Sequence, residues 1–112
     1  MNYYKAPDDC RYHYEIEGSG PPLLMLHGII QGIAEWRRAG WIDALSDIRT
    51  LVILDMPGHG HSDRPAEHHS YRIETIAAGV IGLMASLGHP RFDLFGFSLG
   101  GRVGFEILAR NA

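Results

Sequence analysis

A serine between glycines is the feature of this sequence with the clearest chemistry. An apolar run leads into Gly96-x-Ser98-x-Gly100, and a helical pattern follows it. A strand that turns sharply into a helix exposes one serine hydroxyl at the turn, where that hydroxyl can attack a carbonyl carbon. We expect Gly96 and Gly100 at the two positions where strand and helix approach too closely for side chains. Ser98 is therefore the predicted nucleophile at a nucleophile elbow.

Two phosphate-binding motifs also place glycines between a strand and a helix, and neither fits these residues. A P-loop requires Lys and then Ser or Thr after its second glycine, whereas Gly101 is followed by Arg102 and Val103. A dinucleotide-binding fingerprint requires glycine at the position of Ser98. We therefore expect no bound cofactor.

A second candidate segment follows the apolar run Leu23–Leu26, which predicts a buried strand. Ligands bind outside the carboxyl ends of parallel strands, so His27-Gly28-Ile29 is expected to face the same crevice as Ser98. The backbone N–H groups of Ile29 and Leu99 would form an oxyanion hole. The position of the first donor is predicted to within one residue on either side of Ile29. We expect the His27 side chain to orient this loop and not to act as the general base.

A third segment, rich in Gly, Pro and His, follows the predicted strand Thr50–Leu54. Asp55 or Asp63 could supply the acid of a catalytic triad, but we expect their carboxylates to accept backbone N–H bonds that hold the loop. His59 and His61 are the histidines nearest the right level of the sheet to act as a base. We interpret both as parts of a rigid structural loop.

The elements that position these residues alternate between strand and helix. Two short segments, Asn2–Lys5 and Arg11–Ile16, predict an antiparallel hairpin. Buried strands are predicted at Leu23–Leu26, Thr50–Leu54 and Phe92–Phe97, and helices at about 34–46, at Tyr71–Leu87 with Gly88 as its C-terminal cap, and from Leu99 onward. This order predicts an α/β fold with a mostly parallel sheet, a hairpin plus three buried strands, and three helices. We expect a single domain over 1–112, with the hairpin at 1–20 and a βαβαβα core at 21–112.

Composition narrows the possible functions. The 112 residues are 46% hydrophobic and 21% charged, which is ordinary for a soluble globular domain. A net charge of −3 makes nucleic acid an unexpected partner. Cys10 is the only cysteine, no apolar leader opens the sequence, and no apolar run approaches the roughly 20 residues of a membrane span. We therefore expect a cytoplasmic protein, and no histidine pair has the spacing of a metal site.

Three motifs together resemble the α/β-hydrolase fold superfamily from about Tyr12 to the end of the chain. They are His27-Gly28, Asp55-x-Pro57-Gly58-x-Gly60-x-Ser62-Asp63 and Gly96-x-Ser98-x-Gly100-Gly101. The chain is most similar to cofactor-free esterases, lactonases and carbon–carbon bond hydrolases of the 3-oxoadipate enol-lactonase type. The resemblance implies Ser98 as nucleophile, an oxyanion hole at the N–H groups of Ile29 and Leu99, and a small carbonyl substrate. Haloalkane dehalogenases and epoxide hydrolases resemble the chain elsewhere but place aspartate at the elbow.

The family's other triad residues have no counterpart here. In the family, the acid follows a later strand and the histidine lies near the C-terminus. We therefore expect these residues to be the N-terminal portion of a serine hydrolase, inactive alone. An end at Ala112 would leave the edge of the last strand bare and Phe105, Ile107 and Leu108 partly uncovered. The alternative is a non-catalytic, truncated α/β module that acts through a partner chain covering that edge.

Overall fold

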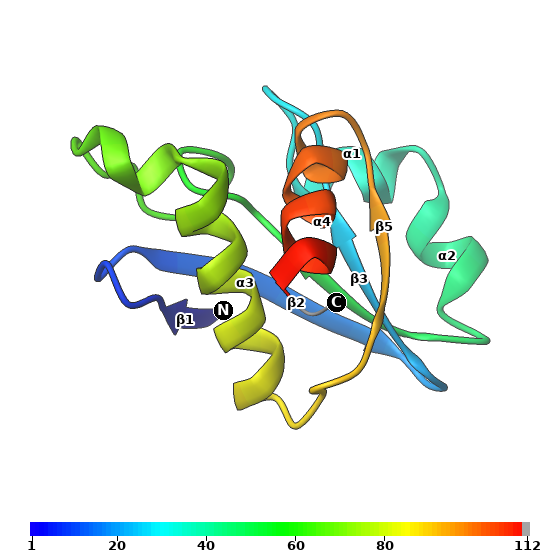
Figure 1. The fold of residues 1–112 in the computed structure, drawn as a ribbon. Coiled ribbons are helices and arrows are strands. Elements are labelled where there is room, and N and C mark those ends of the chain that lie inside the picture. Colours follow the sequence, from blue (N-terminus) through cyan, green and yellow to red (C-terminus); the bar gives the residue numbers. More distant parts are fainter. Residues whose placement is uncertain (111–112) are drawn as a thin grey trace.

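A five-stranded sheet with helices on both faces forms the fold in the computed structural model, which describes residues 1–110 (Figure 1). The elements in chain order are β1 (Asn2–Lys5), β2 (Arg11–Gly18), β3 (Pro22–Leu26), α1 (Ile33–Arg38), α2 (Trp41–Leu45), β4 (Thr50–Leu54), the 3₁₀ turn η1 (His68–Tyr71), α3 (Ile73–Ser86), β5 (Asp93–Gly96) and α4 (Leu99–Arg110). Asn111 and Ala112, which the predicted domain and last helix include, lie outside the described residues.

The sheet has the order β1-β2-β4-β3-β5. The predicted hairpin is confirmed, because β1 and β2 pair antiparallel with Lys5 opposite Arg11. β2 is also antiparallel to β4, whereas β3 is parallel to both β4 and β5. The α/β class is confirmed, and the expected parallel character holds only for the group β4, β3 and β5.

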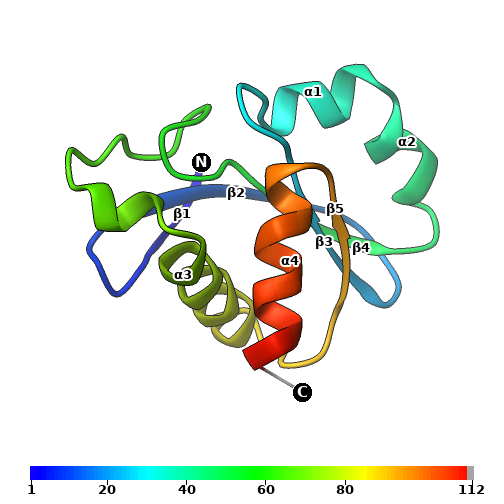
Figure 2. The same ribbon diagram turned by 45° about the horizontal axis from the view of Figure 1, so that its top comes forward.

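Strands β3 and β4 are buried on both faces, as their uninterrupted apolar runs predict. Alternate residues point to opposite faces of a strand. Four residues of β3 and β4 join the core beneath α3 and α4, namely Leu24, Leu26, Val52 and Leu54. The other four, Leu23, Met25, Leu51 and Ile53, join a second core with residues of α1 and α2 on the opposite face (Figure 2).

The number of helices differs from the expectation. The single helix predicted at 34–46 is two short helices, α1 and α2, so that the described residues contain four α-helices instead of three. The break lies at Gly40, whose φ of +86° is a left-handed conformation that interrupts the helical path. The helix predicted from Tyr71 begins at Ile73, because η1 occupies the preceding residues. Gly88 follows this helix with φ +81°, as a C-terminal glycine should.

β5 is an edge strand, and its burial also differs from the expectation. Asp93 is exposed and the other three residues of β5 are only half-buried, because none of the described strands pairs with its outer side. On α4, Phe105 is 75% and Leu108 66% exposed. The expectation that Ile107 is partly uncovered is wrong, since it is 4% exposed and packs into the core beneath α3.

Two glycines of α3 allow this helix to lie directly on the tyrosines of the hairpin. A Cβ added to Gly79 would lie 2.7 Å from Cε2 and 2.8 Å from Cζ of Tyr12. A Cβ on Gly82 would overlap the hydroxyl of Tyr4. Glycine inside a helix costs about 1 kcal/mol relative to alanine. Here that cost is offset by the close packing of α3 against the buried Tyr12 ring and the half-buried Tyr4 ring.

We expect Gly79→Ala to lower the free energy of unfolding by about 1–3 kcal/mol, because the added methyl group displaces the buried Tyr12 ring. The matched control is Gly101→Ala in α4, whose Cβ would meet its nearest atom at 3.6 Å. That control should be neutral or stabilising by up to about 1 kcal/mol. Urea denaturation of both variants measures the difference, and equal midpoints would contradict the packing argument.

Candidate active site

Ser98 lies on the turn between β5 and α4. β5 ends at Gly96 and α4 begins at Leu99, so only two residues connect strand and helix. Ser98 is exposed and has φ +53°, a left-handed conformation that is strained for a residue with a side chain. The N–H of Phe97 donates to the carbonyl of Leu26 at 3.0 Å, which ties the turn to the end of β3. This is the geometry of a nucleophile elbow.

The turn is as tight as the pattern predicts. A Cβ on Gly96 would lie 2.6 Å from the carbonyl oxygen of Gly100. A Cβ on Gly100 would overlap the carbonyl oxygen of Leu26 and lie 2.8 Å from that residue's Cβ. All three atoms that would clash belong to the backbone or are directly attached to it, so they cannot move aside cheaply. The close approach of strand and helix therefore requires both glycines.

The loop of residues 27–32 reaches the same edge of the sheet. Leu26, the last residue of β3, pairs with Gly96 in parallel register, so this loop and the elbow leave neighbouring strands side by side. A Cβ on Gly28 would lie 2.9 Å from Cδ2 of Phe97, the residue before Ser98. The structure thus brings together the two segments that the sequence analysis assigned to one site.

Some backbone N–H groups of this loop have a hydrogen-bond acceptor within the protein, and others do not. The N–H of Gly28 donates to Oε1 of Gln31 at 2.9 Å, and the N–H of Ile30 donates to Nε2 of His59 at 3.1 Å. Over residues 1–110, the N–H groups of Ile29 and Leu99 donate to no protein acceptor. These two groups are therefore open to an external acceptor.

His27 is a structural residue, as expected. Its Nδ1 lies 2.7 Å from the carbonyl oxygen of Gly28, so Nδ1 carries the proton and donates it. Its Nε2 accepts the N–H of Met56 at 2.9 Å. Burial is the largest influence on this ring and lowers the pKa of His27, which favours the neutral form that both bonds require. Neither ring nitrogen is free to move a proton.

Asp55 follows β4 and joins three parts of the chain. Its Oδ1 accepts the N–H of Ile33, at the start of α1, at 2.9 Å. Its Oδ2 lies 2.7 Å from Nδ1 of His13 on β2 and accepts the N–H of His61 at 3.1 Å. Burial raises the pKa of Asp55, but these three hydrogen bonds outweigh burial and hold the pKa below its ordinary value. The expected structural role is confirmed.

The neighbouring candidates are bound in the same framework. Asp63 accepts the backbone N–H of Arg11 at 2.9 Å and that residue's guanidinium at 3.2 and 3.3 Å. The His59 ring donates from Nδ1 to the carbonyl of Pro57 at 2.9 Å. Throughout the described residues, no side chain hydrogen-bonds to the Ser98 hydroxyl. The structure therefore places the loop that contains Ile29 beside the turn at Ser98. It leaves Asp55, Asp63, His27 and His59 in structural roles.

Sequence reasoning did not identify three side chains of this framework. His13 belongs to β2, where strand alternation places it with Arg11 and Glu15, opposite the core residue Tyr12, so the pattern did not indicate its burial. Gln31 and His59 were missed as acceptors of loop N–H groups, because the sequence holds no signal for which loops come together.

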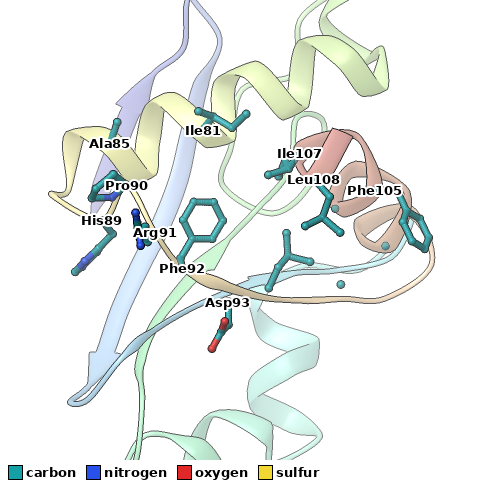
Figure 3. A pocket seen from close by; sticks show the side chains of 14 residues that line it. Ile81, Ala85, His89, Pro90, Arg91, Phe92, Asp93, Phe105, Ile107 and Leu108 are labelled. Atoms are coloured by element: carbon teal, nitrogen blue, oxygen red, sulfur yellow. The ribbon is translucent and has the colours of Figure 1, made fainter. Parts of the chain in front are cut away.

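A groove runs beside the uncovered edge of β5. It has a volume of about 920 Å³ and lies between the end of α3, β5 and α4. The lining includes Asp93 of β5 and Phe92, the residue before it. On α4 it includes Phe105, Ile107 and Leu108 (Figure 3). Most of the groove lining is apolar.

Comparison with known proteins agrees with this geometry. The family described as "alpha/beta hydrolase fold" matches residues 21–112. The fluoroacetate dehalogenase of a Burkholderia species is 38% identical over 102 residues, which are 88% of this chain and 33% of that protein. The soluble epoxide hydrolase of Corynebacterium strain C12 is 38% identical over 95 residues, 85% of this chain and 32% of that protein. An esterase from Exiguobacterium antarcticum superposes with a TM-score of 0.87 at 27% identity, covering 98% of this chain and 40% of the esterase.

A strand–turn–helix with a positive-φ serine, on a sheet whose central strands are parallel, is the geometry of an α/β hydrolase. The chain belongs to the alpha/beta hydrolase fold family. It spans about a third of the length of the curated relatives it matches. None of the helices within residues 1–110 is long and apolar enough to cross a membrane.

We expect Asp55→Asn to lower the free energy of unfolding near neutral pH by about 2–4 kcal/mol, because it removes the charge that three donors stabilise. Since the folded-state pKa of Asp55 is lowered, its contribution is present above its unfolded pKa of about 3.9 and is lost as the pH falls through the folded value. Denaturant titrations from about pH 6 downward should show a flatter pH dependence in the variant.

The control for this experiment is Asp63→Asn. The backbone N–H of Arg11, followed by its guanidinium, also lowers the pKa of Asp63. That side chain is 34% exposed, so water screens the interaction and the loss of stability should be smaller. An equal pH dependence in wild type and Asp55→Asn would show that Asp55 is not a stabilising charge.

Proposed function

We propose that this chain carries the nucleophile and the oxyanion hole of a serine hydrolase acting on an ester, a lactone or an activated carbon–carbon bond. One observation carries the proposal. Ser98 presents an exposed hydroxyl on a strained turn beside a loop whose Ile29 N–H, like the N–H of Leu99, has no protein acceptor. These are the parts that acyl transfer through a serine requires.

In the proposed reaction, Ser98 Oγ attacks the substrate carbonyl carbon while a histidine accepts the hydroxyl proton. The electron pair of the C=O bond moves to oxygen, and the N–H groups of Ile29 and Leu99 stabilise that oxyanion. Collapse of the tetrahedral intermediate breaks the bond to the leaving group, which the histidine protonates. Water then attacks the acyl group on Ser98 in the same way, which releases the acid and restores the serine.

The choice of Ile29 rests on its neighbours. The loop of residues 27–32 also offers the N–H groups of Gly28 and Ile30, but Gln31 and His59 already accept them. A donor that must bind an oxyanion has to be free of an internal partner before substrate arrives. Ile29 meets this requirement and lies between two residues whose amides are held.

The triad base and acid come, in this proposal, from outside the described residues. The rings of His13, His27 and His59 are held by Asp55 or by backbone groups. The missing residues would belong to a C-terminal half or to a partner chain that packs against the uncovered edge of β5. The apolar groove of about 920 Å³ beside that edge supports this placement.

The serine also bears on the substrate class. The chain resembles epoxide hydrolases and haloalkane dehalogenases over much of its length, and those families place aspartate at the elbow. A serine with a histidine base suits attack on a carbonyl carbon. The likeness to an esterase of known structure supports the same class. The single cysteine fits a reducing compartment, and we place the reaction in the cytoplasm.

A second candidate is a non-catalytic module that acts by docking onto a partner chain. The observation that favours it is the exposed apolar surface of α4, at Phe105 and Leu108, next to an unpaired strand edge. The two candidates differ in one accessible property, which is the reactivity of Ser98 in the complete gene product.

A fluorophosphonate probe should label Ser98 in the complete gene product, because the probe reacts with activated serine hydroxyls. We expect hydrolysis of p-nitrophenyl acetate by the same protein, and loss of both labelling and turnover in Ser98→Ala. Peptide mass spectrometry locates the adduct. Ser86, an exposed serine of α3 whose hydroxyl donates to the carbonyl of Leu83, is the matched control, and Ser86→Ala should keep both signals. An unlabelled, inactive but folded product would favour the docking module.

The 112-residue polypeptide alone should not turn over p-nitrophenyl acetate. An oxyanion hole and binding can supply a residual acceleration of about 10³–10⁴ without a triad, but this requires an enclosed substrate pocket. Stopped and continuous assays against a buffer blank measure the rate. Turnover by the polypeptide that disappears in Ser98→Ala would show that these residues suffice for catalysis.

A further inference from the structure

Two loops at the edge of the sheet are joined by a reciprocal pair of histidine bonds. His27, in the loop of residues 27–32, accepts the N–H of Met56. His59, in the loop that follows β4, accepts the N–H of Ile30 in return, at 3.1 Å. The two rings lie 4.8 Å apart between centroids. Each loop therefore holds a backbone amide of the other.

The His59 ring can accept this bond in only one tautomer. Its Nδ1 lies 2.9 Å from the carbonyl oxygen of Pro57, and because a carbonyl only accepts, Nδ1 carries the proton. The bare Nε2 then faces the Ile30 amide. Turns within the loop, from His59 N–H to Met56 and from Ser62 N–H to His59, hold the histidine backbone in place.

Ile30 needs such support. Its φ of +63° is left-handed, which is an outlier for a β-branched residue. Its side chain is 89% exposed, so side-chain packing contributes little to holding this conformation. The backbone bond to His59 is the contact that can compensate for the strain. Ile29, the proposed oxyanion donor, is the residue directly before it.

We infer that His59 is a positioning residue: by accepting the Ile30 N–H it holds the left-handed conformation that keeps the Ile29 N–H directed at the elbow. This inference rests on the proposed function for its catalytic consequence. The hydrogen bond itself does not depend on that function. His59 touches no reacting atom, and it acts only through the backbone of Ile30.

Two variants separate the acceptor from the ring. His59→Gln places an amide oxygen at about the reach of Nε2, so it can still accept the Ile30 N–H. His59→Leu keeps an apolar side chain of comparable size and removes the acceptor. His61→Leu is the matched control. The His61 ring is exposed, lies in the same loop and packs against the ring of His13.

The first test uses NMR on the complete gene product and needs no activity. We expect a scalar coupling across the hydrogen bond between the Ile30 amide nitrogen and Nε2 of His59. We also expect hydrogen exchange at the Ile30 amide to be at least about tenfold faster in His59→Leu than in wild type, His59→Gln or His61→Leu. Absence of the coupling in wild type, or equal exchange in all four proteins, would overturn the inference.

The second test reads the catalytic consequence. If the ester hydrolysis proposed above occurs, His59→Leu should lower kcat by about 10-fold or more with little change in KM, because a misplaced oxyanion donor affects the transition state most. His59→Gln should restore most of kcat, and His61→Leu should resemble wild type. A wild-type protein without esterase activity would contradict the proposed function and leave the NMR result to decide the hydrogen bond. An unchanged kcat in His59→Leu would overturn the positioning role.

Discussion

Leu26, at the carboxyl end of β3, is the residue at which the constraints on the site meet. It pairs with Leu54 on one side and Gly96 on the other, in parallel register. Its carbonyl accepts the N–H of Phe97, and Gly100 packs against the same group. Because parallel strands bring their carboxyl ends to one edge, the segments that follow β3, β4 and β5 must converge there. The elbow, the proposed oxyanion donor and the histidine pair all depend on that register.

Two strained residues lie at this edge, and neither could hold its conformation alone. Ser98 and Ile30 both have positive φ. The elbow serine is held by the close contact between strand and helix, whereas Ile30 is held by a histidine from another loop. Strain of this kind persists only where the surroundings over-determine it. The rings of His27 and His59, which accept backbone N–H groups, and the carboxylate of Asp55 supply those surroundings.

The relatives show how far a shared fold restricts function. The chain is similar over most of its length to a dehalogenase and an epoxide hydrolase, and it superposes on an esterase with a TM-score of 0.87. A fold supports several chemistries, and the reacting residues decide among them. The scaffold places one side chain at the elbow, and in this chain that side chain is Ser98. Within the described residues, the outer edge of β5 is unpaired and an apolar groove lies beside it.

Local chemistry in the sequence determined the strands, the elbow and its glycines. Short uninterrupted apolar runs favour strands buried on both faces, as β3 and β4 are, and the tight turn at Ser98 leaves no room for side chains at Gly96 and Gly100. Only the tertiary structure decided which partners the polar groups find. The half-exposed state of β5 and the bond from Ile30 to His59 depend on how segments far apart in the chain are arranged. Such contacts follow from strand order and loop direction, which no local pattern of residue types encodes.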